Sequence, residues 1–160
     1  MKHTIRIAVK EDMKQVLELI QELADFEKES NAVEITVEDL IADGFGPRPL
    51  FKCFVAEMDG KIDGIALFYQ RYSTWKGKTI HLEDLVVRHT SRGSGIGSAL
   101  FAEVIKQGHK EGVKRIEWVV LDWNTPAVEF YKKNGAIILR DWDTVQLDDQ
   151  GIKNFIAKHN

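Results

Sequence analysis

The sequence contains a single cysteine, Cys53, among its 160 residues, so an internal disulfide is excluded. Cys53 lies in the apolar run Phe51–Val55, where a cysteine is more often a small buried hydrophobic side chain than a nucleophile. A lone thiol suits a reducing compartment. The expected location is therefore the cytoplasm.

Long apolar runs and a strong positive charge are also missing. No stretch approaches the roughly 18 apolar residues of a membrane-spanning helix, and Met1–Arg6 lack the apolar core of a signal peptide. The formal net charge is −3, which does not favour the strongly basic face that nucleic acids require. We expect neither a membrane nor a nucleic acid as partner. A mildly acidic chain agrees better with a cationic small molecule.

Metal-ligand and nucleotide-binding spacings are missing as well. The five histidines show no H-x-x-x-H spacing, and there is no pair of cysteines, so no metal site is predicted. The glycine-rich segment 92–98 contains no Gly-Lys-Ser/Thr sequence, which excludes an ATP-binding P-loop there. The serines at 91–98 lack a nucleophile elbow, so a covalent serine intermediate is not expected.

The sequence has enough apolar residues for one sizeable core, with 44% hydrophobic and 29% charged residues. We predict a single domain over residues 1–160, of the α+β class, with one mixed, mostly antiparallel sheet of about seven strands flanked by helices. Periodicity and turn signals place strands at 5–8, 51–58, 61–70, 79–87, 115–121, 136–140 and 143–147. Helices are predicted at 11–26, 36–44, 98–111, 124–134 and 149–158.

A glycine-rich loop, Arg92–Ser98, joins the third strand of the predicted meander to the helix at 98–111. Glycines let backbone amides approach a ligand, and a helix N-terminus favours an anion such as a pyrophosphate. Three interpretations compete: a Rossmann fingerprint, an ordinary glycine-rich turn and a coenzyme A loop. The Rossmann interpretation is disfavoured because the loop follows an antiparallel meander and only about 60 residues remain after it.

The order of two motifs distinguishes between these interpretations of the glycine-rich loop. Arg92-Gly93-Ser94-Gly95-Ile96-Gly97 precedes an amphipathic helix, and Asn124 with Phe130-Tyr131 and Gly135 follows about thirty residues later. This arrangement resembles the GNAT acetyltransferase superfamily, with the loop similar to its motif A and the later helix to its motif B. The resemblance implies the GNAT fold and acetyl-CoA as co-substrate.

Further segments resemble the diamine acetyltransferase family within that superfamily, over roughly residues 5–147. They are Asp43–Gly46, Leu82-Glu83-Asp84, Trp75-x-Gly77-Lys78 and Trp123-Asn124. Ser73-Thr74 stand where the polyamine branch is expected to carry Asp-Pro, so the thialysine branch is more similar. The family's acidic-Gly-Trp segment is shortened here to Arg140-Asp141-Trp142.

The resemblance implies catalytic roles for Glu83 and Tyr131. Glu83, among apolar neighbours before the glycine loop, is the expected base and acts through a bound water; its desolvation would raise its pKa. Without the resemblance, a solvent-facing glutamate is the simpler interpretation. Tyr131 is the expected acid for the thiolate, or else a packed helix residue. Asp84 points to the opposite strand face, unless a bulge of the GNAT kind intervenes.

The remaining expected site residues also follow from the resemblance. Such a bulge would free amides of Leu85 and Val87 for the thioester carbonyl and the pantetheine. Asn124 has two compatible roles, helix cap and coenzyme ligand. The expected coenzyme-binding residues are Leu85, Val86, Val87, Arg92, Gly93, Ser94, Gly95, Ile96, Gly97, Ser98, Asn124, Ala127, Tyr131 and Asn134. The expected acceptor-binding residues are Phe26, Glu27, Trp75, Glu83, Asp84 and Trp142, where carboxylates and tryptophans suit a cation.

These patterns leave two functions open. The first is an N-acetyltransferase that acts by direct transfer in a ternary complex on a small cationic amine, either a lysine analogue such as thialysine or a diamine or polyamine. The second is a non-catalytic acetyl-CoA sensor or partner module. A degenerate sensor is expected to lose Glu83 or Tyr131, and both are present. The resemblance also implies a homodimer that pairs through C-terminal strands.

Overall fold

The computed structural model describes residues 2–159 and separates into two compact units, Met1–Val119 and Val120–Asn160. We describe each unit by itself. In the first unit the elements are β1 (Thr4–Ile7), the 3-10 turn η1 (Lys10–Asp12), α1 (Met13–Phe26), α2 (Val37–Phe45), β2 (Lys52–Met58), β3 (Lys61–Ser73), β4 (Gly77–Val87), the 3-10 turn η2 (His89–Ser91), α3 (Ile96–Glu111) and β5 (Ile116–Glu117). In the second they are α4 (Thr125–Lys133) and α5 (Asp149–His159).

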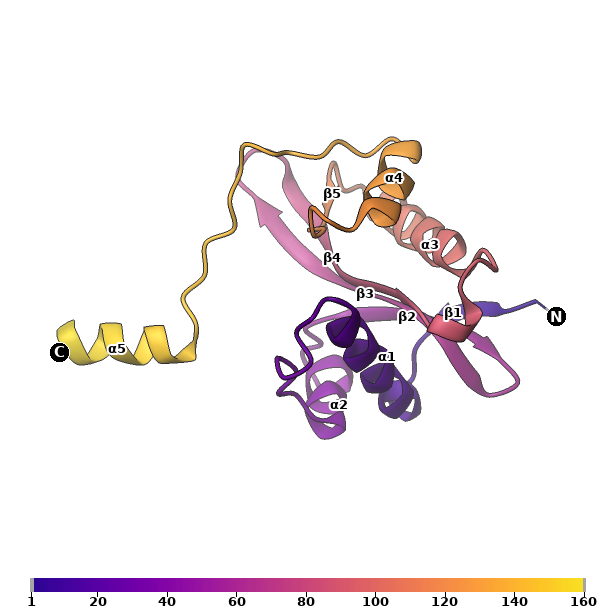
Figure 1. Cartoon of the computed structure of the whole chain (residues 1–160), viewed down its shortest axis with the longest axis horizontal. Coiled ribbons are helices and arrows are strands. Elements are labelled where there is room, and N and C mark those ends of the chain that lie inside the picture. Colours follow the sequence, from indigo (N-terminus) through magenta and orange to yellow (C-terminus); the bar gives the residue numbers. More distant parts are fainter. Residues whose placement is uncertain (1, 160) are drawn as a thin grey trace. The chain divides into compact units, whose positions relative to one another are not determined.

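The first unit is built on a five-stranded sheet in the order β1-β2-β3-β4-β5 (Figure 1). The first four strands are antiparallel to their neighbours, and β5 pairs parallel to β4, so the sheet is mixed as predicted. The turn at Asp59-Gly60 has positive φ at both residues, which matches the twist of a tight hairpin between β2 and β3.

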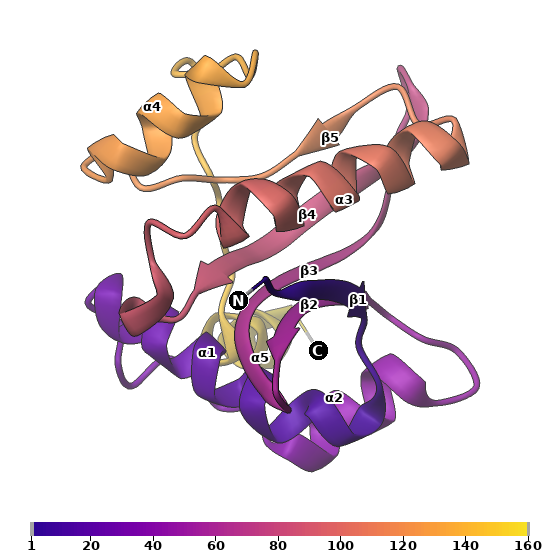
Figure 2. The ribbon, with the colours of Figure 1, turned by 90° about the vertical axis from the view of Figure 1, so that its right-hand side faces the viewer.

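Helices cover both faces of this sheet: α1 and α2 lie on one side and α3 on the other (Figure 2). The apolar stripe of α1, formed by Met13, Val16 and Leu19, packs on the first face in a cluster with sheet residues such as Val55 and Ile65. Each of these five side chains is completely buried. Alternation along the strands puts Phe54, Phe68 and Leu82 on the α3 face, where Leu100 and Val104 of α3 are also buried.

Close packing of α3 depends on Gly64 of β3. A Cβ placed there would lie 2.7 Å from Ile96 and 2.9 Å from Leu100, closer than real Cβ atoms approach. The missing side chain lets the first turns of α3 lie directly on the sheet. The glycine loop that precedes α3 is therefore held against the end of β4.

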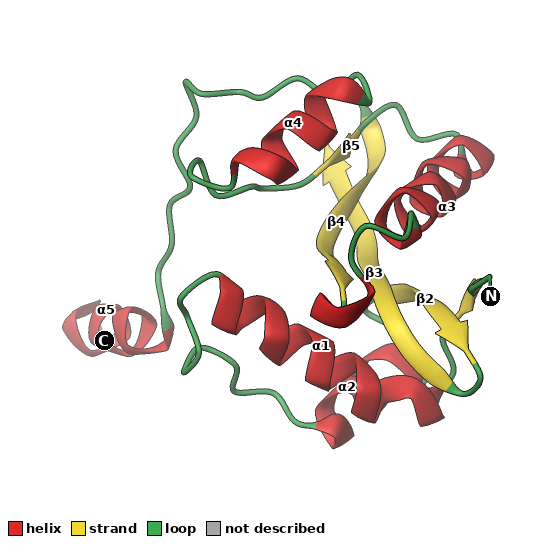
Figure 3. Ribbon diagram, turned by 45° about the vertical axis from the view of Figure 1, so that its right-hand side comes forward, coloured by secondary structure: helices red, strands yellow, loops and turns green. Residues whose placement is uncertain are grey.

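The second unit consists of two helices joined by an irregular segment (Figure 3). Asn124 caps α4 through a hydrogen bond from the Ala127 amide, and α5 begins after Asp148, whose carboxylate accepts from the Gly151 amide. Both helices were predicted close to these limits.

Three predicted strands differ from the structure. The strand expected at 115–121 is reduced to Ile116–Glu117, and 136–140 and 143–147 have no strand structure, so the described sheet has five strands rather than about seven. A strand needs a neighbouring edge for its backbone hydrogen bonds, and neither segment pairs with one in the described chain. Their alternating apolar residues are exposed; they are Ile137, Leu139, Val145 and Leu147.

None of the helices described is long and apolar enough to cross a membrane.

Candidate active site

The candidate site is organised by a bulge in β4. Leu67 of β3 pairs with Asp84, but the next residue, Phe68, pairs with Leu82, so Glu83 is an extra residue without an opposite partner. The bulge predicted for this position is therefore present. It places Asp84 in one row with Leu67 and Cys53, on the face covered by α1. The simple alternation, with Asp84 on the opposite face from Glu83, is thus overridden.

Glu83 also faces this side of the sheet. Tyr69, two residues after Leu67 on β3, donates a hydrogen bond of 2.8 Å to Oε2 of Glu83. The ring of His81 lies 5.3 Å from that of Tyr69, and its Nε2 is 3.6 Å from the same carboxylate oxygen. The Glu83 side chain is about half exposed, at 51%. The expectation of a desolvated Glu83 is therefore corrected: the bulge turns its side chain toward solvent.

The desolvated carboxylate is Asp84 instead. Burial raises the pKa of Asp84 to about 6, and the negative charges of Glu83 and Glu27 add to this shift. Glu27 follows the last turn of α1, and burial, followed by the charge of Glu29, raises its pKa also. Three carboxylates from two elements thus lie within electrostatic reach of one another. Such a cluster attracts a cation because each added positive charge relieves their repulsion.

Asp84→Asn should stabilise the protein at pH 8 by roughly 3 kcal/mol. The folded pKa is about 6 and the ordinary value 3.8, so the fold disfavours the charged form. The stability that Asp84 gives is complete below pH 4 and is lost as the pH rises through about 6. Urea titrations at pH 4 and pH 8 measure the change in the free energy of unfolding, with the hairpin-turn variant Asp59→Asn as control. Equal effects of Asp84→Asn at pH 4 and pH 8 would contradict the assignment.

The glycine loop leaves the N-terminus of α3 accessible. Gly93 and Gly95 have φ of +77° and +83°, and a Cβ built on either would meet no atom within 4 Å. Gly95 is the N-cap residue, and among the described residues no side chain caps this helix. Backbone amides and the positive end of the helix dipole therefore face open space, which fits a pyrophosphate. The predicted loop residues Arg92–Ser98 all lie in this segment.

Arg92 connects the loop to the carboxylate cluster. Its guanidinium carbon lies 5.4 Å from the centre of the Phe26 ring, and its Nε donates to the Val87 carbonyl at 3.4 Å. Phe26 is the last residue of α1, directly before Glu27. The structure thus brings together the predicted loop, the end of β4 and two of the predicted acceptor residues.

The end of β4 also has an unpaired edge. β5 pairs with β4 only at Ile80 and His81, so from Leu82 to Val87 the described residues of the sheet provide a neighbour on the β3 side alone. An unpaired edge offers N–H and C=O groups to an extended ligand with amide groups of its own. The backbone of Leu85, Val86 and Val87, predicted to bind coenzyme A, lies along this edge.

Two tryptophans predicted to bind the acceptor are exposed. Trp75 is 80% exposed in the turn between β3 and β4, where the Ser73 hydroxyl accepts from its amide. Trp142 is 68% exposed in the irregular segment of the second unit. Within the first unit, the structure does not bring Trp75 to the carboxylates.

The other predicted coenzyme residues lie on α4. Ala127, Tyr131 and Asn134 are spaced i, i+4 and i+7, so they share one face of the helix that Asn124 caps. Tyr131 contacts the ring of Phe130 at 5.5 Å, and the Asn134 side chain donates to the Phe130 carbonyl. The helix was predicted, and one of its faces carries all four residues that are predicted to bind the coenzyme.

Sequence reasoning missed Tyr69 and His81. Tyr69 belongs to no motif, and His81 was considered only as a metal ligand. The alternation of side chains along β4 could have indicated His81, because it puts His81 and Glu83 on one face. Tyr69 could not be found in this way, because its pairing with His81 across the strands is known only from the register of the sheet.

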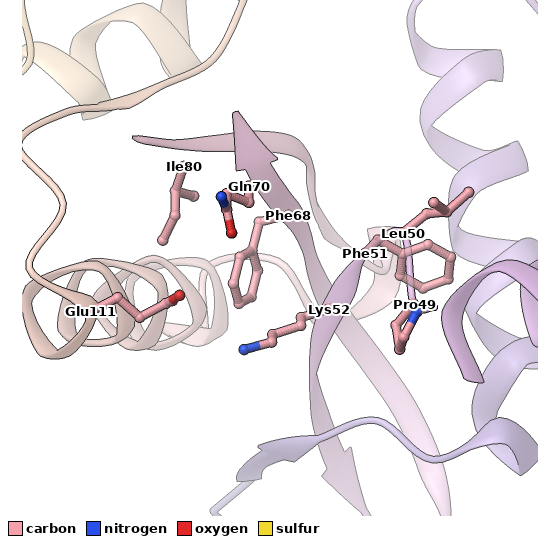
Figure 4. Close-up of a pocket in the computed structure, with 8 residues that line it drawn as sticks. All are labelled: Pro49, Leu50, Phe51, Lys52, Phe68, Gln70, Ile80 and Glu111. Atoms are coloured by element: carbon pink, nitrogen blue, oxygen red, sulfur yellow. The ribbon is translucent and has the colours of Figure 1, made fainter. Parts of the chain in front are cut away.

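A cavity of about 330 Å³ lies away from these residues, on the α3 face (Figure 4). Phe68 and Ile80 form apolar parts of its lining, with Lys52, Gln70 and Glu111 as polar parts. Glu111 is held by Lys78 at 2.6 Å and by Gln107, in a network that fastens α3 to the sheet. No predicted site residue lines this cavity.

Within residues 2–159, no cluster of three or more His, Cys, Asp or Glu side chains is arranged for a metal ion.

Comparison with known proteins agrees with this geometry. The model of the acetyltransferase (GNAT) family matches residues 13–136. The thialysine N-epsilon-acetyltransferase of Mus musculus is 41% identical, and that of Bos taurus 38%; each comparison covers 96% of this chain and 97% of the relative. An integron cassette protein from V. cholerae has the same fold, with a TM-score of 0.80, 22% identity and 98% of both chains covered.

The family match runs from the first residue of α1 to Ala136, three residues after the end of α4, and so includes the bulged strand, the glycine loop and the helix that carries Tyr131. Together with relatives that are similar over almost their whole length, it shows that this chain belongs to the GNAT family of acetyltransferases.

Proposed function

We propose that this chain is one acetyltransferase domain, residues 1–160, which transfers the acetyl group of acetyl-CoA to a primary amine of a small cationic acceptor. The observation that carries the proposal is the β4 bulge. It sets Glu83 and Asp84 on one face beside Glu27, on the strand that leads into the glycine loop. An acetyl donor and a cationic acceptor would then meet at the end of β4. Release of coenzyme A thiol with a panel of amines tests this.

Acetyl-CoA would lie along β4 and reach the N-terminus of α3. Its pyrophosphate fits the open side of Gly93 and Gly95, where helix amides and the Arg92 guanidinium supply positive charge. Its pantetheine amides fit the unpaired edge of Leu85–Val87. Asn124, Ala127, Tyr131 and Asn134 complete the proposed binding residues from α4.

The acceptor would be a primary amine on a short cationic chain. Glu27, Glu83 and Asp84 supply the negative charge, and Phe26, Trp75 and Trp142 the aromatic surfaces. The names of the mouse and cattle relatives, together with Ser73-Thr74, favour a lysine analogue such as thialysine over a diamine or polyamine.

The chemistry follows from the state of the amine. An alkylamine of pKa near 10 is mostly protonated at pH 7 and cannot attack a carbonyl. Glu83 would take its proton through a bound water, and the free amine would attack the thioester carbon. A β4 amide would hold the oxyanion of the tetrahedral intermediate. The C–S bond then breaks, and the thiolate takes a proton from Tyr131. The nitrogen loses its second proton to solvent as the amide forms, and solvent returns a proton to the Tyr131 phenolate. Transfer is direct, without an acetyl-enzyme.

Tyr131→Phe should lower kcat by about 10²-fold, the lower end of the range for a general acid. The effect is moderate because a thiolate of pKa near 8.5 leaves without much help. The KM for acetyl-CoA should stay within about twofold, since the ring is retained. Steady-state kinetics beside a melting curve measures both, and Tyr131→Ala, which also opens a cavity, should be worse. A folded Phe variant with wild-type kcat would assign the proton to water.

A non-catalytic acetyl-CoA sensor is the rival function. The family match and the relatives favour the enzyme. Glu83 and Tyr131 are both retained, and Glu83 is held by a hydrogen bond in a cluster of carboxylates that coenzyme binding alone does not require.

We also propose a homodimer in the cytoplasm. The segment 136–147 carries alternating apolar residues that are more than 60% exposed, and strands of this kind are stabilised by a second edge. A second copy would supply it. Light scattering should then give twice the 18.3 kDa of one chain.

The lone cysteine, Cys53, is buried, and burial raises the pKa of its thiol, which agrees with an unreactive structural role.

A further inference from the structure

The Glu83 carboxylate has two different oxygens in this structure. The Tyr69 hydroxyl donates to Oε2 at 2.8 Å, and His81 Nε2 approaches the same atom at 3.6 Å. Oε1 has neither of these neighbours. A half-exposed glutamate on a bulge has three rotatable side-chain bonds and would otherwise sample many orientations. Here one oxygen is fixed to the sheet and the other is available to a ligand.

We propose that Tyr69 is the positioning residue of this site, whose hydroxyl holds the Glu83 carboxylate in the orientation needed to take a proton from the acceptor amine. This inference rests on the proposed role of Glu83. Proton transfer requires a base within hydrogen-bond reach of the donor, so a fixed carboxylate is more effective than a mobile one. The bond to Oε2 leaves Oε1 for the acceptor or its water.

Tyr69 is well suited to this role. It lies on β3, in the middle of the sheet, and its ring lies against the ring of its cross-strand partner His81, tilted by 35°. Burial, and then the bond to Glu83, raise the pKa of the Tyr69 phenol to about 12. The hydroxyl therefore keeps its proton, and remains a donor, at every pH at which the amine is converted.

His81 contributes packing rather than a proton pathway. Nη1 of Arg71 lies 3.5 Å from Nδ1 of His81, and a guanidinium can only donate, so Nδ1 is the acceptor. Arg71 is in turn paired with Glu117 at 3.1 Å. The other ring nitrogen, Nε2, is the one that faces Glu83. The proton taken by Glu83 leaves through solvent, which its half-exposed side chain contacts.

Tyr69→Phe tests the inference, because it removes the hydroxyl and keeps the ring. We expect kcat to fall roughly tenfold, the effect of one hydrogen bond to a charged group, with the KM for acetyl-CoA within about twofold. Tyr72→Phe is the matched control. Tyr72 lies on the same strand, is 72% exposed and by alternation faces the other side of the sheet, so its kinetics should match the wild type.

A double-mutant cycle shows whether Tyr69 acts through Glu83. In a Glu83→Ala background, Tyr69→Phe should have no further effect on kcat. A second full tenfold loss there would mean that Tyr69 acts independently of Glu83 and would overturn the inference. Wild-type activity of Glu83→Ala alone would remove Glu83 as base, and with it the catalytic role of Tyr69.

The contact can also be read without activity. In protein with ¹³C-labelled glutamate, the Glu83 carboxyl signal is assigned by its loss in Glu83→Gln. Tyr69→Phe should change the chemical shift of this signal at neutral pH, because the hydrogen bond to Oε2 is lost, whereas Tyr72→Phe should leave it unchanged. An unchanged signal in Tyr69→Phe would overturn the inference, even in a protein that acetylates amines. A changed signal in a protein that acetylates none would support the contact and contradict the proposed function.

Discussion

Glu83→Gln lowers kcat/KM for a good acceptor by roughly 10³-fold at pH 7, in the middle of the range for a general base. The amide cannot take the ammonium proton, although it keeps the size of the side chain and can still accept from Tyr69. The loss should shrink toward pH 10, because part of the amine is then already free. The ratio of mutant to wild-type activity across this pH range is the measurement.

The control for this variant is Glu103→Gln, which neutralises a carboxylate on α3 that is paired with Lys106. It should retain wild-type activity at every pH. A Glu83→Gln deficit that stays the same from pH 7 to pH 10 would mean that Glu83 positions the substrate through its charge and does not take the proton.

Gly95→Val weakens coenzyme A binding by roughly 10³-fold, which corresponds to the loss of two hydrogen bonds to a charged group. The φ of +83° is unfavourable for a β-branched residue, and the added side chain occupies the open side where the pyrophosphate would lie. Titration calorimetry with coenzyme A measures the change, and the phosphate contacts should account for most of it.

Gly60→Val is the control for Gly95→Val, because it introduces the same backbone strain away from the proposed coenzyme site. Gly60 has a φ of +78° in the β2–β3 turn, and a Cβ there also meets no atom within 4 Å. This variant should lose stability to a similar extent and keep its affinity for coenzyme A. A folded Gly95→Val protein with unchanged affinity would place the coenzyme elsewhere.

Most of the first unit could be predicted because its signals are local. The stripe of α1 and the Asp59-Gly60 turn are read from a few neighbouring residues, and both are present. The segments 136–140 and 143–147 have an equally clear alternation but no strand structure. Alternation records which side chains prefer burial, whereas a strand also needs a partner edge, which the sequence of one chain does not contain.

The candidate site also combines features that local sequence motifs predict with features that depend on contacts between distant residues. The glycine loop and the bulge came from motifs, and the bulge only through the resemblance, since alternation alone separates Glu83 from Asp84. Which of the two carboxylates is desolvated depends on the register with Leu67 and on the packing of α1, so the prediction chose Glu83 and the structure has Asp84. The Tyr69 hydrogen bond joins residues on two strands and could not be found without that register.

Whether this chain acetylates amines is decided by mass spectrometry of small amines incubated with the wild-type protein and acetyl-CoA. The panel should contain thialysine, lysine, a diamine and a polyamine, with Glu83→Gln protein in parallel. We expect a singly acetylated product from at least one cationic amine, formed in equal amount with free coenzyme A thiol and greatly reduced with the variant. Acetyl-CoA that binds with no amine acetylated would contradict it and identify the chain as a sensor of the coenzyme.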